Sequence, residues 1–310
     1  MTSNLLAGLL AGVLTFALFS FGTSGRGELG ILIQISCVPL FAAGLGFGWR
    51  AALCGALVVA AGLLTQRGLP QAFSFALIFG LPVVALSAIA TAKHGALDKG
   101  RRLGWMLAAA ALVAGLLGGF AASAFSIATS VDQAELTRQI TAQMKVAMGD
   151  AAVSGQAGLS IEDVIGFVFK HIGELIAVGA LVLILGNMAL AAGILRLTGR
   201  AQRPLTDVAL IDLPFGFLLG LLVALGATLL PGAPGLFARA LSVAGIGVLA
   251  ITGLAIFHYL LRGHGFRFPG LIIAYLALLV LNLFAIAIFA LLGLIEPLLG
   301  LRPKPDATKP

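Results

Sequence analysis

Apolar residues form long runs along this chain, and short breaks rich in glycine, proline or charge separate them. A membrane-spanning helix needs about 20 apolar residues, with a range near 17–25. The runs that fit are residues 4–21, 29–47, 50–66, 72–92, 103–128, 171–196, 213–231, 239–261 and 269–295. The pattern predicts an all-α, polytopic transmembrane helical bundle of about nine spans.

The third run is the least secure of these spans. Residues 50–66 are at the short limit, and only Gly48-Trp49 separates them from residues 29–47. The two runs form either a tight helical hairpin or one broken, re-entrant element. If residues 50–66 do not cross the membrane, eight spans remain.

The longest polar interval, residues 129–170, predicts an amphipathic insert outside the membrane. Four apolar residues recur there at four-residue intervals among charged and amide side chains: Leu136, Ile140, Met144 and Met148. Ser160 and Asp163 then have the form of a helix capping box, with Asp in place of the usual Glu or Gln. A helix from about 161 to 196 would exceed a ~30 Å hydrocarbon core, so its first turns should project outside.

Composition supports a membrane protein and argues against a soluble one. Of 310 residues, 60% are hydrophobic and 10% are charged, and the mean hydropathy is +1.11. Soluble domains are about 45–50% apolar and about 25% charged, so the apolar excess must meet lipid. The net charge of +7 does not predict nucleic-acid binding, because the basic residues form no stripe.

The distribution of lysine and arginine predicts the orientation. Placing the loop from Lys93 to Arg102 in the cytoplasm also puts Arg50, the 196–203 segment and the 262–267 segment inside. The short outside loops then hold only Arg26, Arg67 and Arg239. The rule predicts a bacterial cytoplasmic (inner) membrane protein with a cytoplasmic N-terminus. Nine spans place the C-terminus outside, although the basic tail from Arg302 argues against that.

No catalytic or nucleotide-binding motif is present in the sequence. It has no G-x-x-x-x-G-K-[ST], no H-E-x-x-H and no G-x-S-x-G, and no paired carboxylates fall inside a predicted span. The two cysteines, Cys37 and Cys54, have no metal-ligand spacing and are interpreted as small buried apolar residues. We therefore expect no enzyme activity, no cofactor and no metal site.

Amide side chains inside the predicted spans are candidates for ligand or partner contacts. Gln34, Asn187 and Asn282 are the examples. A polar group inside a membrane is costly unless it is partnered, and this makes it a functional candidate. The alternative is a structural hydrogen bond between helices.

Charged side chains near span ends give two more candidates. His258 and Arg262 lie one helical turn apart and share a face. They serve either as interfacial anchors or as a docking site for an anionic group. Glu174, near Lys170 and His171 at the outer end of the sixth span, forms either an external ion pair or a substrate contact.

Residues 31–66 resemble the helical hairpin of S-components, the substrate-capturing subunits of energy-coupling-factor vitamin transporters. The similarity lies in Pro39, Gly48-Trp49-Arg50, Gly55 and Gly62. The first span carries Ala7-Gly-Leu-Leu-Ala11, similar to the A-x-x-x-A face with which S-components dock onto a coupling subunit. The resemblance implies helix docking through Ala7 and Ala11.

The whole length resembles the YybS-like family of bacterial membrane proteins, through Gly253-Leu-Ala255, His258, Leu261-Arg-Gly263 and Tyr275. This resemblance brings no established reaction. It implies an S-component-like six-helix core over residues 1–196, which includes the insert, and a three-helix region with a short tail over residues 197–310.

Two functions remain open at this point. In the first, the protein binds a small molecule or lipid and acts with partner subunits. Transport is one such role, and because the chain has no P-loop, an ATP-driven step would need a separate ATPase. In the second, it is a membrane scaffold in an envelope or division assembly with no transported substrate. The sequence identifies neither the ligand nor the oligomeric state.

Overall fold

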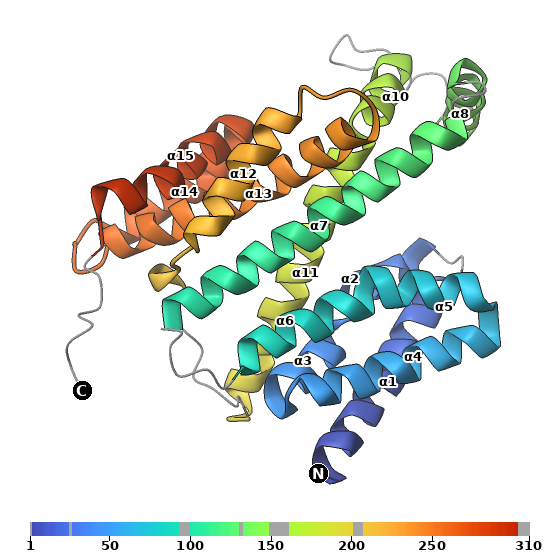
Figure 1. The fold of residues 1–310 in the computed structure, drawn as a ribbon, viewed down its shortest axis with the longest axis horizontal. Helices are drawn as coiled ribbons and strands as arrows, with labels where there is room; N and C mark the ends of the chain where they lie inside the picture. The colour runs from blue at the N-terminus through green and yellow to red at the C-terminus, as the bar shows by residue number, and fades with distance from the viewer. Residues whose placement is uncertain are drawn as a thin grey trace. The chain divides into compact units, whose positions relative to one another are not determined.

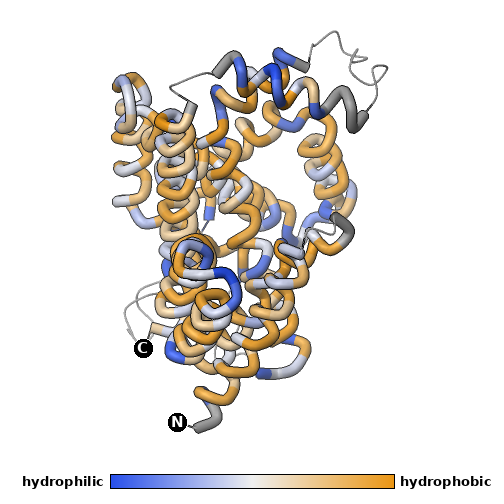
Figure 2. The backbone as a smooth tube through the Cα atoms, turned by 90° about the vertical axis from the view of Figure 1, so that its right-hand side faces the viewer, coloured by the Kyte–Doolittle hydropathy of each residue, from blue (hydrophilic) through white to orange (hydrophobic). Residues whose placement is uncertain are grey.

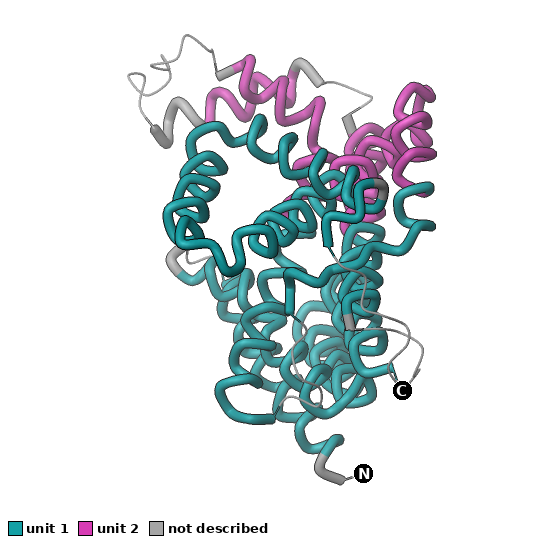
Figure 3. Tube along the Cα trace, turned by 90° about the vertical axis from the view of Figure 1, so that its left-hand side faces the viewer, with its two compact units in different colours: residues 1–113, 181–219, 245–310 teal, residues 114–180, 220–244 magenta. Residues whose placement is uncertain are grey.

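The structure, a computed structural model, describes residues 2–24, 27–92, 99–129, 133–148, 161–200 and 207–302. Within these ranges the chain forms helices and turns and no strand (Figure 1). It divides into two compact units, shown in Figure 3. Unit 1 comprises Met1–Val113, Leu181–Leu219 and Gly245–Pro310, and unit 2 comprises Ala114–Ala180 and Gly220–Ala244. The domain boundary predicted at residue 196 stays a prediction.

Six apolar segments in the described ranges are long enough to cross a membrane. They are Asn4–Gly22, Trp49–Arg67, Leu69–Thr91, Gly100–Ala128, Ile172–Leu197 and Gly232–Leu260. Four shorter apolar helical segments are Ile31–Phe47, Phe215–Ala227, Arg267–Val280 and Leu283–Pro297. The tube in Figure 2 is predominantly orange, as expected for helices that face lipid. The all-helical membrane class is confirmed, and the count of nine spans is not reproduced.

The helices of unit 1 begin with α1 (Thr2–Gly22), α2 (Ile31–Ile35), α3 (Val38–Phe47), α4 (Trp49–Arg67), α5 (Leu69–Phe75) and α6 (Leu81–Thr91). Single turns, η1 (Gly27–Gly30) and the π-helical η2 (Ala76–Gly80), join some of them. The long helices α7 (Lys99–Thr129), α11 (Ile172–Leu197) and α13 (Gly232–Leu260) contribute to both units. At 1.5 Å per residue, the 31 residues of α7 extend about 46 Å, well beyond a ~30 Å hydrocarbon core.

Close backbone contact holds α1 against α4. A Cβ at Gly8 would lie 2.5 Å from the carbonyl oxygen of Ala51, and one at Gly12 would lie 2.6 Å from that of Gly55. Only glycine permits this approach, which is the packing that small residues at four-residue spacing favour in membranes. The similarly spaced Gly216 has nothing within 4 Å of its Cβ position, so spacing alone does not identify a packing face.

The two runs that meet at Gly48 form a tight helical hairpin. Gly48 has φ 95° and separates α3 from α4, a backbone conformation that favours glycine. The 19 residues of α4 make a full apolar helix, so the segment that looked least secure is well formed. The preceding run is broken instead, at Ser36-Cys37, and Pro39 in the first turn of α3 supplies no N–H to bridge the break.

Unit 2 contains the predicted amphipathic helix, α8 (Gln133–Met148), which packs against α10 (Ile161–Lys170). The side chains of Met144 and Met148, and residue Ser160, lie outside what the structure describes. The single helix predicted from about 161 to 196 forms as α10 and α11 with an irregularity at His171. The His171 amide still donates to the Phe167 carbonyl at 3.0 Å.

The single span predicted over residues 269–295 is wrong. Asn282, with φ 41°, separates α14 (Arg267–Val280) from α15 (Leu283–Leu299). Their 14 and 17 residues extend about 21 and 26 Å, less than the core thickness.

The α14–α15 segment is a helical hairpin whose two ends lie together. Arg262, shortly before α14, pairs with Asp207, and Arg302, shortly after α15, donates to the carbonyl of Ala209. The two helices contact each other along the way (Figure 1). The chain therefore leaves this hairpin at the end where it entered.

This geometry predicts that the C-terminus lies on the same side of the membrane as the loop that precedes α14. Single cysteines at His264→Cys and Pro310→Cys, in a chain with Cys37→Ala and Cys54→Ala, should react together with a membrane-impermeant maleimide added to one side. Leu230→Cys, beyond the opposite end of α13, is the control and should react from the other side. Opposite labelling of positions 264 and 310 would contradict the hairpin.

Candidate functional site

A short segment between α11 and α12 (Phe215–Ala227) organises the polar end of unit 1. Asp207 accepts a hydrogen bond from the Ala209 amide at 3.1 Å and begins the single turn η3 (Val208–Leu210). The Asp212 amide donates to the carbonyl of Gly100 at 3.2 Å. Ala209 and Ile211 are buried. We call residues 207–212 the clasp segment, because side chains from three helical regions hold it in place.

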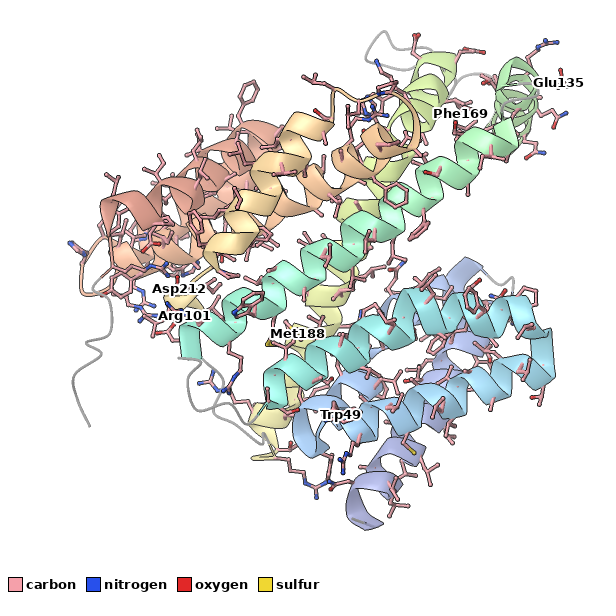
Figure 4. All side chains as sticks on the ribbon, in the orientation of Figure 1. Trp49, Arg101, Glu135, Phe169, Met188 and Asp212 are labelled. Atoms are coloured by element: carbon pink, nitrogen blue, oxygen red, sulfur yellow. The ribbon has the colours of Figure 1, made fainter. Side chains whose placement is uncertain are left out.

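Two glycines in the first turns of α7 make room for the clasp segment. A Cβ at Gly100 would overlap the carbonyl oxygen of Leu210, and one at Gly104 would overlap that of Asp212. The neighbouring Arg101 reaches the Asp212 carboxylate at 3.6 Å (Figure 4). Both of these side chains are exposed, so the ion pair itself contributes little to stability.

Arg262 binds Asp207 through two parallel contacts. Its Nη2 donates to Oδ1 at 2.6 Å and its Nη1 lies 2.5 Å from Oδ2, the bidentate geometry that arginine and carboxylate favour. This hydrogen bond, aided by the Ala209 amide and the charges of Arg262 and Arg267, lowers the pKa of Asp207. The same bond raises the pKa of Arg262. The pair stays ionised at neutral pH.

Arg302 ties the end of the α14–α15 hairpin to the clasp segment. Its Nη1 donates to the Ala209 carbonyl at 2.9 Å and its Nε donates to Glu296 at 3.0 Å. The Arg302 side chain is only 9% exposed. A buried guanidinium is stable only when it is paired and hydrogen-bonded, and Arg302 meets both conditions.

The predicted pair of His258 and Arg262 lies at this end of the molecule, but the two side chains have different partners. The Nε2 of His258 lies 3.0 Å from the Tyr275 hydroxyl of α14. Arg262 is already neutralised by Asp207, so an anionic ligand at Arg262 would have to displace that carboxylate. The docking role of His258 and Arg262 stays a prediction.

Asn187 joins two helices that are far apart in the sequence. Its Nδ2 donates to the carbonyl of Gln34 at 2.6 Å and to that of Leu183 at 2.8 Å. The break at Ser36-Cys37 leaves Gln34 near the C-terminal end of α2, where carbonyls lack intrahelical donors. Asn187 is 5% exposed, and its Oδ1 has no hydrogen-bond partner in the described part of the chain. Asn187 thus makes a structural hydrogen bond between helices through its Nδ2. Its Oδ1 is the acceptor that a ligand could still use.

Glu174 lies in unit 2 and pairs with a residue that sequence reasoning did not connect to it. The Nε of Arg239, from α13, donates to Glu174 Oε1 at 3.1 Å, and His171 Nδ1 lies 3.6 Å from the same oxygen. The Glu174 side chain is mostly buried and that of Arg239 is half-buried. The Glu174 carboxylate therefore has an ion-pair partner in the structure, and a substrate contact at Glu174 stays a prediction.

The remaining candidates lie apart from these clusters. Ala11 is 6% exposed and lies inside the unit 1 bundle, which weighs against a docking role for it, and Ala7 is half-buried. Asn282 is exposed at the tip of the α14–α15 hairpin and caps no amide of α15 with its side chain. Among the described residues, no group of three or more His, Cys, Asp or Glu side chains could hold a metal ion.

Sequence reasoning missed most of the partners in these clusters. Asp207, Tyr275 and Arg239 each pair with a residue 17 to 65 positions away, whereas Glu296 pairs with Arg302 only 6 positions away. A local signal existed in the Gly100 and Gly104 spacing at the start of a span. The spacing of these glycines does not reveal which segment packs on them, because the tertiary fold determines that contact.

The apolar helices and the clustered polar ends define a polytopic α-helical membrane protein. The chain belongs to the family described as "Predicted membrane protein (DUF2232)", whose family model matches residues 13–296. No curated protein and no solved structure matches the chain. The similarity to the YybS-like family and the S-component-like core stay predictions.

The close approach of the clasp segment predicts that Gly104→Ala destabilises the protein. The added methyl group must displace the Asp212 carbonyl, and overpacking of this kind typically costs about 1–3 kcal/mol. Gly186→Ala in α11 is the matched control, because nothing lies within 4 Å of its Cβ position. Thermal unfolding in detergent should show a lower midpoint for Gly104→Ala and an unchanged or higher one for Gly186→Ala. Equal midpoints would refute the packing.

The hydrogen bond between Asn187 and the Gln34 carbonyl predicts a moderate loss of stability in Asn187→Leu. Interhelical hydrogen bonds in membranes contribute about 0.6 kcal/mol on average and up to about 1.7 kcal/mol. The substitution also leaves the Gln34 carbonyl unpaired. The neighbouring Met188→Leu is the control and should unfold like the wild type. A stability for Asn187→Leu at or above the wild-type value would show that the amide is not structural.

Proposed function

We propose that this protein is a non-enzymatic scaffold in a membrane assembly, and that it acts by binding partner proteins and not by capturing a substrate. The supporting observation is the filled interior of the α1–α6 bundle. Phe41 and Phe75 are 1% exposed and Leu40 is fully buried. The helices α1–α6 of the predicted substrate-capturing core therefore surround packed side chains, and a ligand there would have to displace them at the cost of native packing.

The clasp segment supports the same proposal. Arg262 and Arg302 are held by the chain's own carboxylates and carbonyls, which leaves them unavailable to an anionic substrate. This arrangement fixes the ends of α7, α13 and α15 to one segment. A rigid polar end of this kind suits a platform on which other subunits assemble.

The basic residues of the clasp support a cytoplasmic location for it. Arg101, Arg262 and Arg302 gather around residues 207–212, and cytoplasmic segments are enriched in Lys and Arg. We place this end and the N-terminus on the cytoplasmic side of a bacterial inner membrane.

The second candidate function is the capture of a small molecule or lipid by a transport subunit that works with a separate ATPase. One observation favours it: the buried Oδ1 of Asn187 has no partner in the described part of the chain. A ligand that donates a hydrogen bond would satisfy this oxygen.

Photo-crosslinking in native membranes distinguishes the two candidates. A photo-reactive amino acid at Leu10, which is 58% exposed on α1, should capture a defined partner if this face docks an assembly. The same amino acid at Val13, 57% exposed, tests the adjacent part of that face, and an unirradiated sample is the background control. Mass spectrometry identifies both the crosslinked proteins and the small molecules that co-purify. Recovery of an ATPase pair with a coupling subunit would exclude scaffolding in favour of transport.

A further inference from the structure

A shallow groove runs along the outer surface of α4 beside the start of α1. It has a volume of about 490 Å³ and is lined by Leu5 of α1 and by one face of α4: Arg50, Leu53, Cys54, Leu57, Val58 and Ala61. The α4 residues follow the i, i+3, i+4 spacing of a single helix stripe. From Arg50 to Ala61 the stripe extends about 16 Å. An open apolar stripe of this kind can lie alongside an extended hydrocarbon chain.

The only charge in the groove lining is at one end. Arg50 lies in the first turn of α4, with its guanidinium 5.6 Å from the centre of the Trp49 ring. Figure 4 labels Trp49 at this end of the helix. No carboxylate of the described chain pairs with Arg50 in an ion pair, in contrast to Arg262 and Arg302. Tryptophan and arginine together are typical of the level of the lipid headgroups.

We propose that this groove binds an anionic phospholipid, with an acyl chain along Leu53, Leu57 and Ala61 and the phosphate at Arg50. Charge complementarity selects this occupant. A bare guanidinium at headgroup level attracts anionic lipid, and an apolar stripe of this length accepts an acyl chain without any polar requirement. A zwitterionic lipid gains less at Arg50, because its own ammonium group opposes the arginine charge.

The proposal goes beyond the scaffold function and does not depend on it. The groove belongs to the outer surface of α1 and α4, whereas the scaffold proposal rests on the filled interior of the same bundle. A lipid at this place would be a retained, specific component of the protein and not part of the exchanging annulus.

Native mass spectrometry of the full chain, released from nanodiscs that contain phosphatidylglycerol and phosphatidylethanolamine, measures the bound lipid. The wild type should retain phosphatidylglycerol in preference. Arg50→Gln should weaken this retention about fivefold, the equivalent of about 1 kcal/mol for one basic residue near the membrane surface. Arg50→Lys should restore most of it. Arg67→Gln, the same change at the other end of α4, is the matched control and should retain lipid like the wild type.

Ala61→Phe tests the groove independently of the charge. The side chain at Ala61 is exposed, so a phenylalanine fills the groove without entering the core, and it should reduce the retained phosphatidylglycerol while leaving thermal stability unchanged. Equal retention by the wild type and Arg50→Gln would overturn the proposal, and so would unchanged retention in Ala61→Phe. A dimer that Ala61→Phe dissociates, with no change in lipid, would assign the groove to a second copy of the chain and would also overturn it.

Discussion

The constraint on which this structure depends is the need to satisfy backbone polar groups where water is absent. A carbonyl or amide without a partner in hydrocarbon costs several kcal/mol, so every helix break needs a donor or acceptor from elsewhere. The break after α2 presents the Gln34 carbonyl, and Asn187 of α11 donates to it. The turn at Ala209 presents a carbonyl, and Arg302 donates to it. Both of these irregular segments are thus tied to a residue that is distant in the sequence.

The same constraint explains why glycine occurs where two segments meet backbone to backbone. At Gly8 and Gly12 the partner is another helix, and at Gly100 and Gly104 it is the clasp segment. In the second case the contact lets the Asp212 amide reach the Gly100 carbonyl. Dispersion between close backbones and a satisfied amide together stabilise the junction, where an apolar solvent offers no hydrophobic driving force between helices.

The sequence predicted the class of this fold well, because the hydropathy and length of an apolar run directly reflect the lipid layer that the helix must cross. It located Asn4–Gly22 and Trp49–Arg67 almost to the residue. It failed over residues 269–295, where the apolar run is long enough for one span and only Asn282 marks a turn. A polar residue in an apolar run is compatible with a continuous helix that has an interhelical hydrogen bond, so the pattern could not distinguish the two. The decisive contacts of Arg262 with Asp207 and of Arg302 with Ala209 join residues 55 and 93 positions apart, which no local pattern encodes.

The candidate site residues differ in what satisfies their polar groups. His258, Arg262, Glu174 and Asn187 were recognisable as costly polar groups, and in each case the structure supplies a partner from another helix or from the clasp segment. A charge that the chain neutralises itself is a structural element, since a ligand must first break the internal pair. Arg50 differs, because it lies on an apolar stripe and no carboxylate in the described part of the chain pairs with it, so in the proposed site an anionic lipid balances its charge. The distinction between self-satisfied and externally satisfied polar groups is therefore a better guide to function here than polarity inside a span.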